Sequence, residues 1–372
     1  MARRPAPLRS RIVTHIGKLD AREWDSVVSA AGMRHEAAAT MHEVRVKRDW
    51  VYALVRDEHG PYAVITGRPH RGSPFLRRAL LEVTSHLGVL GGIQLRRGVE
   101  LESALPRLVP TLARMARRRG CAGFSVLVPD IDAAIYAKHD FAFFEDAAVS
   151  ATDLSGDASY DDLVKRLPDP RARRRARKKS EQHGLRFEVT SPPRGPTREL
   201  FALVAETFAT HETPLSFTPD FFERIWSTRF AEHVLLCAYL GDKPIAACWA
   251  FHTGGVLVSA VAGLHYPIAR PSHADLSIYD ETLRFAMSRG IRRIEWGPTN
   301  CDIKQRYGGA TQRVVGAVRP AYPLPGPIWR GLRAALRTDL GARIVGEREL
   351  GDVARGGASA SHLEETLSEG RP

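Results

Sequence analysis

The sequence has few cysteines, and they lack the spacing that structural cysteines show. Its 372 residues include four cysteines, with no C-x-x-C pair and no histidine partner at zinc-finger spacing. A disulfide framework or a zinc site would need such spacing, so we expect reduced thiols in a cytoplasmic protein and no bound metal. An apolar run of about 18 residues is also missing, which argues against a membrane-spanning helix. The basic first residues lack the apolar stretch of a signal peptide.

Acidic residues are fewer than basic ones. The sequence has 54 lysines and arginines against 42 acidic residues, a net charge of +12. Such an excess favours a polyanionic partner, namely tRNA, a nucleotide-linked substrate, coenzyme A or an anionic membrane surface. An arginine- and alanine-rich composition inherited from a GC-rich genome would give the same excess. The charge alone therefore leaves both interpretations open.

The length of the chain predicts two domains, because one hydrophobic core rarely extends over 372 residues. We expect a disordered arm, a first domain, a second domain, and a C-terminal helix with a disordered tail, over 1–12, 13–155, 156–330 and 331–372. In the first domain the apolar patterns predict helices over 20–31, 76–86 and 100–118. They predict strands over 50–56, 62–66, 89–95, 122–128 and 141–144.

The second half has a clearer order of elements. A strand precedes two helices, which start at Thr197 and at Thr218-Pro219. Three strands then follow with short turns between them, which predicts an antiparallel meander. A helix and two further strands complete the series. The strands are expected over 185–189, 234–240, 245–251, 256–262, 291–296 and 313–318.

This β-α-α-β-β-β-α-β order is that of the GNAT acyltransferase fold, and the first half echoes it. The expected fold class is mixed α/β, with tandem GNAT-like domains of which the first is degenerate. Each domain is expected to hold a mostly antiparallel sheet flanked by helices. Topology alone does not fix a function.

The stretch from Ser272 to Gly309 combines a helix, a strand and a basic loop. Ser272 with Asp275 three residues later is a variant of the capping box, and Gly290 ends the helix. The backbone N–H groups at the start of such a helix form an anion site. The loop after the strand presents three side chains that we expect to be functional, Lys304, Arg306 and Tyr307.

A strongly basic helix lies near the start of the second domain. Asp169 and Pro170 form a helix start, and the nine residues 171–179 that follow include seven basic ones. A helix this polar is not held by core burial alone. It is either a solvated face on a short connector or a docking surface for a polyanion.

The second half resembles the Fem-type branch of the GNAT superfamily. The resemblance rests on the run 206–225, on the meander with GDKPIAACWAF, and on the spacing of Tyr279, Gly290, Gly297 and Lys304 with the residues after it. It covers 163–320 well and the first half only in architecture. It implies two GNAT-like domains and transfer of an activated acyl group, from aminoacyl-tRNA or an acyl thioester, to an amine.

The sequence departs from the family pattern at two places. The Q/R-x-x-G-x-G/A loop that binds coenzyme A is replaced by residues 270–274, which puts use of acetyl-coenzyme A in doubt. The long helical hairpin of some cell-wall members is missing. The basic helix and the missing loop favour tRNA over acyl-coenzyme A as donor. We expect no tightly bound cofactor.

Candidate catalytic residues follow from what acyl transfer needs: a neutral amine, a stabilised oxyanion and a protonated leaving group. Lys304 could neutralise the oxyanion, or it could be a surface lysine. Tyr279 could protonate a leaving group or pack in the core, and Glu295 is a possible base. No Walker loop and no Ser-His-Asp elbow is present, so we expect direct attack without a covalent intermediate.

Binding residues are expected on both sides of the reaction. The donor or its phosphates would contact Ser272, His273, Arg306, Tyr307, Arg174, Arg175 and Lys178. The acceptor, a small-molecule amine in bacterial cell-wall, lipid or natural-product biosynthesis, would contact His211, Trp249 and His265. Single histidines are also common as structural residues. The rival interpretation is a non-catalytic protein that binds nucleic acid or a membrane surface on a GNAT scaffold. The oligomeric state does not follow from the sequence.

Overall fold

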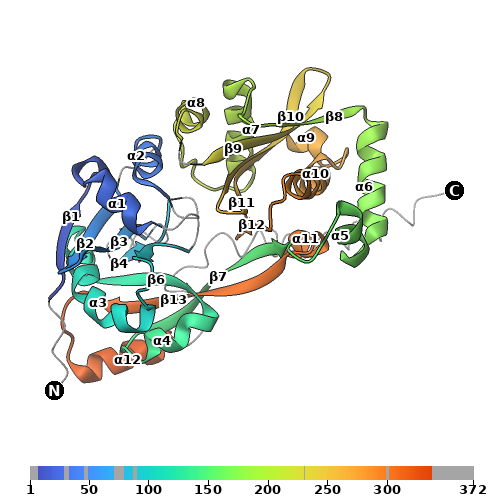
Figure 1. The fold of residues 1–372 in the computed structure, drawn as a ribbon. Coiled ribbons are helices and arrows are strands. Elements are labelled where there is room, and N and C mark those ends of the chain that lie inside the picture. The colour runs from blue at the N-terminus through green and yellow to red at the C-terminus, as the bar shows by residue number, and fades with distance from the viewer. Residues whose placement is uncertain are drawn as a thin grey trace. The chain divides into compact units, whose positions relative to one another are not determined.

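The computed structural model describes residues 7–28, 33–45, 49–70, 79–86, 90–229, 231–298 and 301–336. Its contacts divide the described chain into two units. The first comprises the residues up to 147, together with 228–229 and 313–336, and the second comprises 148–227 and 231–312. Both are mixed α/β, with mostly antiparallel strands flanked by helices, which confirms the predicted fold class (Figure 1).

The first unit holds the elements from the N-terminus to β7 and the last helix. Its strands are β1 (Arg9–Val13), β2 (Val51–Asp57), β3 (Gly60–Pro69), β4 (Leu80–Val83), β5 (Ile93–Leu95), β6 (Gly123–Pro129) and β7 (Ala142–Asp153). Its α-helices are α1 (Ala21–Val27), α2 (His35–Glu43), α3 (Leu101–Arg118), α4 (Ala133–Ala137) and α12 (Gly326–Leu336). Leucines and alanines of α3 pack on the buried faces of β2, β3 and β6.

The second unit repeats the same order of elements. Its strands are β8 (Leu185–Thr190), β9 (Glu232–Leu240), β10 (Lys243–Thr253), β11 (Val256–Leu264) and β12 (Arg293–Gly297), together with the last residues of β7 and the first of β13 (Ala310–Pro320), whose residues from 313 belong to the first unit. Its helices are α5 (Tyr160–Arg166), α6 (Pro170–Gln182), α7 (Thr197–Thr210), α8 (Phe221–Trp226), α9 (Tyr266–Ala269), α10 (Ala274–Ser288) and α11 (Cys301–Arg306). The predicted meander is confirmed, because β10 pairs antiparallel with both β9 and β11.

The last strand in the strand order of each unit comes from a distant part of the chain. In the first unit the strands lie in the order β1-β2-β3-β4-β6-β13, and in the second in the order β8-β9-β10-β11-β12-β7. Residues Val314 to Pro320 of β13 thus pair with β6, and Ser150 to Asp153 of β7 pair with β12. Each order contains one parallel pair, β4 with β6 and β11 with β12. The repeat is therefore visible in pairing as well as in element order.

Alternation along β10 separates two layers of core in the second unit. Ala246, Cys248 and Ala250 face α10 and its leucine, isoleucine and alanine side chains. Trp249 points to the other face, where its ring meets Phe221 of α8 at 5.4 Å. This period-two pattern is what a strand covered on both faces requires. α10 and the α7–α8 pair therefore cover opposite faces of the meander.

Several predicted elements differ from the structure. The predicted helix over 76–86 is wrong for its described part, which is strand β4. Its residues Leu80, Leu81 and Val83 are buried between β3 and β6, and a continuous apolar run is typical of such a strand. Residues 9–12 of the expected disordered arm belong to β1, which pairs with β2. The predicted tail beyond 352 lies outside the described residues.

Helix boundaries also shift. α1 ends at Val27 rather than near residue 31, although Asp20 caps it with a hydrogen bond to the Glu23 N–H. Thr197 is the first residue of α7 and not its cap, and α8 begins only at Phe221. The predicted start of the basic helix is confirmed, since the Asp169 side chain accepts the Ala172 N–H at 3.0 Å.

Candidate active site

The parallel strands β11 and β12 part soon after they meet. They pair from Val256 with Arg293 to Val258 with Glu295. Beyond that point β11 continues to Leu264 paired with β10 but not with β12. The register of β10 against β11 shifts between Trp249 and Ala250, and the bulge bends β11 at that point. Ligands of open α/β sheets bind beyond the carboxyl ends of such strands. The diverging ends of β11 and β12 therefore form the candidate site.

The edge of β11 that leaves β12 carries backbone groups not used by the meander. The Leu264 N–H donates to the Thr207 hydroxyl of α7 at 2.8 Å, so it points away from β10. By the two-residue period of a strand, the N–H of Ala262 points to the same edge, and Ala262 is exposed. An extended ligand could therefore lie along this edge and accept a hydrogen bond from it.

Lys304 lies at the start of this divergence. Its Nζ donates to the Gly297 carbonyl at the end of β12 at 3.0 Å, and a side chain placed on Gly297 would lie 3.9 Å from the Ser259 carbonyl of β11. Lys304 is only 2% exposed, and burial lowers its pKa to about 8. Both the predicted loop and the surface-lysine alternative are wrong, because Lys304 belongs to helix α11 and faces inward. An ammonium with two remaining N–H donors thus lies beneath the strand end.

The two predicted tyrosines support the Lys304 helix. The buried Tyr307 ring stacks on Tyr279 with centroids 5.2 Å apart, and Tyr279 packs at 5.2 Å against Trp296. Burial raises the pKa of Tyr307 well above its usual value. The Trp296 indole donates to Thr152 of β7 at 2.8 Å, which fixes the aromatic stack against β7. These aromatic side chains hold α11 against α10 and β12.

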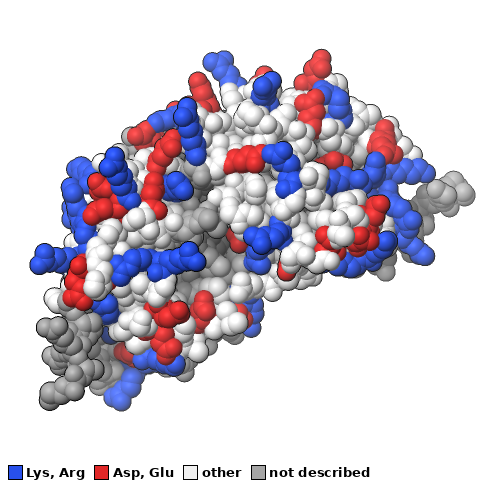
Figure 2. Space-filling view, viewed as in Figure 1, with Lys and Arg blue, Asp and Glu red and all other residues white. Residues whose placement is uncertain are grey.

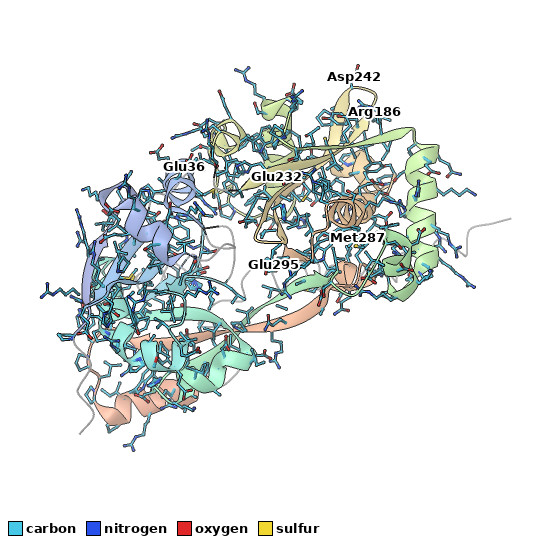
Figure 3. All side chains as sticks on the ribbon, viewed as in Figure 1. Glu36, Arg186, Glu232, Asp242, Met287 and Glu295 are labelled. Carbon is cyan, nitrogen blue, oxygen red and sulfur yellow. The ribbon has the colours of Figure 1, made fainter. Side chains whose placement is uncertain are left out.

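Other predicted residues lie apart from Lys304. Glu295 projects to the exposed side of β12, where it pairs with Arg293 at 3.5 Å, while Ile294 and Trp296 point inward (Figure 3). Arg306 is exposed on α11. Trp249 is buried in the aromatic layer under α8, and its indole N–H has no partner within the described residues.

The predicted capping role of Ser272 is wrong. Ser272 is fully buried and its hydroxyl donates to the Ile268 carbonyl at 2.6 Å, so it closes the preceding turn. The cap position of α10 is His273, which has a left-handed φ of 57° and makes no side-chain capping bond. The Asp275 carboxylate instead accepts the neighbouring Leu276 N–H at 2.9 Å, and burial raises its pKa to about 6. A carboxylate therefore already lies at this helix start.

A second polar group lies at the far end of β11. Glu206 of α7 accepts from the His265 ring Nδ1 at 2.9 Å and from the Tyr266 N–H at 3.1 Å. The Tyr266 hydroxyl bonds to His211 at 2.8 Å, and Arg270 lies over the Tyr266 ring at 4.9 Å. The structure thus brings the predicted residues His211 and His265 together through neighbours.

Sequence reasoning missed Glu206, Tyr266 and Arg270, although α7 contains a signal. Leu200, Val204, Thr207 and His211 recur at helical spacing, and the last two are polar where a core residue is expected. Polar side chains on an inward face indicate a site or a satisfied network. Here they meet the end of β11.

The two polar groups are far apart along the strand. Six residues separate Ser259, beside Gly297, from His265, which corresponds to about 20 Å at the rise of a β-strand. One reacting carbon cannot touch both Lys304 and His265. The arrangement instead suits an elongated ligand, with its reacting end near Lys304 and its remote end near His265.

The basic helix α6 presents two different faces. Its buried residues are Arg173, Ala176 and Ser180, and the Ser180 hydroxyl bonds to Ser277 of α10 at 2.8 Å. The exposed basic face consists of Arg171, Arg174, Arg175, Arg177, Lys178 and Lys179. Figure 2 shows lysine and arginine gathered over this helix. Burial, Lys179 and Arg175 lower the pKa of His273, so the basic face adjoins the start of α10.

Within the described residues, no cluster of histidine, cysteine, aspartate or glutamate could hold a metal ion. None of the helices in that part of the chain is long and apolar enough to cross a membrane.

Comparison with known proteins relates one part of the chain to a family. Residues 170–305 match the model of the acetyltransferase (GNAT) domain. No curated protein matches the chain. Among solved structures, L-PGS from Bacillus licheniformis is 15% identical with a TM-score of 0.53, and covers 84% of this chain and 93% of its own. FemX is 12% identical with a TM-score of 0.53, and the match covers 87% of this chain and 100% of FemX. A third structure is the C-terminal domain of an Agrobacterium fabrum protein described as a lysylphosphatidylglycerol synthetase. It is 12% identical with a TM-score of 0.54, and the match covers 85% of this chain and 95% of that domain. At these identities the structures show a shared fold.

Proposed function

We propose that this chain, whose residues 170–305 match the acetyltransferase (GNAT) domain and which shares a fold with FemX, is an acyltransferase that transfers an aminoacyl group from aminoacyl-tRNA to a small-molecule amine. The product would be an amide in a bacterial cell-wall, lipid or natural-product pathway. Acyl-coenzyme A is the alternative donor.

The basic face of α6 is the observation that carries the tRNA assignment. Six exposed cations lie on one helix, and among the residues that the structure describes only Arg177 has an acidic partner, Glu181 at 3.0 Å. Cations that follow one helix suit the phosphates of a nucleic-acid backbone. The start of α10, by contrast, already holds the Asp275 carboxylate. Repulsion between that carboxylate and a pyrophosphate weighs against coenzyme A.

The proposed reaction is a direct displacement. The neutral amine attacks the ester carbonyl carbon, a C–N bond forms, and the C–O bond to the ribose breaks. The proton that the amine loses is balanced by the one that the ribose oxygen gains. Lys304 would stabilise the oxyanion with its positive charge, because a buried donor acts strongly in a site of low dielectric.

The test is tRNA binding as a function of salt. Replacing Arg174, Arg175 and Lys178 with alanine should lower the slope of log affinity against log salt concentration by about two, since each phosphate contact contributes about 0.7 to 0.9. A matched variant removes three exposed arginines of the first unit, Arg22, Arg97 and Arg118. It has the same net charge and should bind tRNA as the wild type does.

Two results would contradict the tRNA assignment. One is equal loss of affinity in both triple variants, which would reduce the effect to net charge. The other is turnover of an acyl-coenzyme A without tRNA, which would leave acyl transfer in place and change the donor.

A further inference from the structure

An apolar stripe is exposed around helix α12 of the first unit. It consists of Tyr322, Leu324, Ile328 and Leu332, which are 50%, 39%, 59% and 43% exposed. The described residues contain six exposed large hydrophobic side chains, and four of them lie in these eleven positions. Single exposed apolar residues are ordinary on a protein surface, whereas a cluster of them marks an interaction surface.

The side of α12 opposite to solvent packs on the first unit, and this packing keeps the stripe exposed. Trp329 is buried against Phe144, Val318 and Leu80, and its indole N–H donates to Asp140 at 3.0 Å. Arg333 donates to the same carboxylate at 2.6 Å. Ile328 and Leu332 are four residues apart and share one side of the helix, about a quarter turn from Trp329. The helix cannot bury the stripe by rotation without losing the Trp329 contacts.

A cation lies at one end of the stripe. The Arg117 guanidinium lies over the Tyr322 ring at 5.6 Å and also donates to the Ala321 carbonyl at 2.5 Å. Arg330 is exposed, but it lies two residues from both Ile328 and Leu332 and so projects from the other side of the helix. The Asp140 carboxylate is engaged by Trp329 and Arg333. The stripe is therefore apolar, with the Arg117 cation at its Tyr322 end.

We propose that α12, with the segment 322–324 before it, docks on an anionic lipid surface. A helix with apolar side chains on one side lies in the plane of a bilayer, where those side chains enter the interface and a neighbouring guanidinium group, here that of Arg117, meets lipid phosphates. A stable protein partner is less suited, because such interfaces take about 20 to 30 residues a side. The net charge of +12 adds long-range attraction to the same surface. This proposal does not depend on the identity of the acyl donor.

The test is co-sedimentation of the full chain with vesicles of phosphatidylcholine, alone or with phosphatidylglycerol. The wild type should bind the anionic vesicles, and added salt should weaken binding. Replacing both Ile328 and Leu332 with serine should lower the partition coefficient about tenfold, because two apolar side chains leave the interface. Ile131→Ser is the control, since Ile131 is 78% exposed in the same unit and lies outside the segment 322–332. Arg117→Ala should weaken binding to anionic vesicles only, and Arg330→Ala, on the other side of the helix, should weaken it less.

Three outcomes would overturn the proposal. Equal loss of binding with Ile131→Ser would show that the stripe has no special role. A wild-type dimer that becomes a monomer on replacement of Ile328 and Leu332, without vesicle binding, would make the stripe an interface between two copies. Vesicle binding only after removal of residues 337–372 would show that the chain covers its own stripe. Unchanged thermal unfolding of the serine variants verifies that folding is intact, as expected for exposed positions.

Discussion

The two units differ most where the parallel pair of each one ends. The helix after β12 is α11 and the helix after β6 is α4, and the fourth residue of each faces inward. That residue is Lys304 in the second unit and Tyr136 in the first, both 2% exposed. Tyr136 packs edge-on against Phe141 at 5.2 Å, whereas Lys304 bonds to a strand carbonyl. The repeat therefore keeps the same buried position and changes its chemistry from apolar to cationic.

The ends of β4 and β11 also differ, because the chain closes the end of β4 but leaves the end of β11 open on the β12 side. After β4 the chain returns as β5 and pairs again with β3, and the Thr66 N–H donates to Gly92 at 2.8 Å. A side chain on Gly92 would lie 2.4 Å from the Thr84 nitrogen, so this return is tightly packed. The segment between carries His86, which is buried against Tyr52, and burial lowers its pKa well below the usual value. The first unit closes its strand end with its own chain, while β11 continues past its pairing with β12 and meets no further strand on that edge within the described residues.

The largest expected effect comes from removing the cation that distinguishes the units. Lys304→Met should lower the rate of acyl transfer at least about 100-fold, since loss of one oxyanion-stabilising group typically costs that much. Tyr136→Phe, at the equivalent position, should keep the rate within about twofold. Single-turnover kinetics with saturating donor would measure both. If Lys304→Met kept a tenth of the rate, the buried ammonium would be structural only.

The same variant has an opposite expected effect on stability. An unfolded lysine titrates near 10.4, whereas burial lowers the pKa of Lys304 to about 8. Between these values the unfolded chain binds a proton that the folded chain does not, so stability rises as the pH increases from about 8 to about 10. Below pH 8 the full cost of burying the charge is present. Lys304→Met should therefore raise the free energy of unfolding at pH 7 by on the order of 2 kcal/mol and lose the rise above pH 8. Urea denaturation at several pH values would measure this.

Local signals in the sequence predict much of the fold. Asp169 with Pro170 is enough to place the start of α6, and alternation with short glycine turns is enough to place the β9–β11 meander. The pairing of β7 with β12 and of β13 with β6 joins segments that are far apart in the sequence. Whether β13 pairs with β12 or with β6 depends on which edge is open in the folded molecule, and both would suit its apolar pattern.

The candidate site could be predicted only in part for the same reason. Lys304 stands out by its spacing from Gly297, but its burial depends on the aromatic stack of Tyr279 and Tyr307. The Glu206–His265 pair joins residues 59 positions apart. A glutamate on a helix is ordinary until the helix meets the end of β11. Tertiary contact, rather than residue type, turns these side chains into a site.

A smaller effect is expected at the remote end of β11. Glu206→Gln keeps an acceptor for the Tyr266 N–H but loses the charge that orients His265, so the rate with limiting acceptor should fall about tenfold. The matched control is Glu232→Gln, because Glu232 pairs with His252 at 3.3 Å in the same unit with similar exposure (Figure 3). Its rate should stay within about twofold. Equal rates for the two variants would show that the end of β11 does not position the acceptor.

The smallest effect on rate is expected at the start of α10, where a carboxylate lies in place of a bound anion. Asp275→Asn keeps the oxygen that accepts the Leu276 N–H and removes the charge. Because burial raises the pKa of Asp275 to about 6, the folded chain binds a proton that the unfolded chain lacks between about pH 4 and pH 6. Stability from this group is therefore lost as the pH rises through that range, and the variant should gain roughly 1 to 2 kcal/mol at pH 7. Its rate with aminoacyl-tRNA should change less than about twofold. A large gain in coenzyme A affinity, measured by calorimetry, would instead show that this helix start is a pyrophosphate site held shut by one carboxylate.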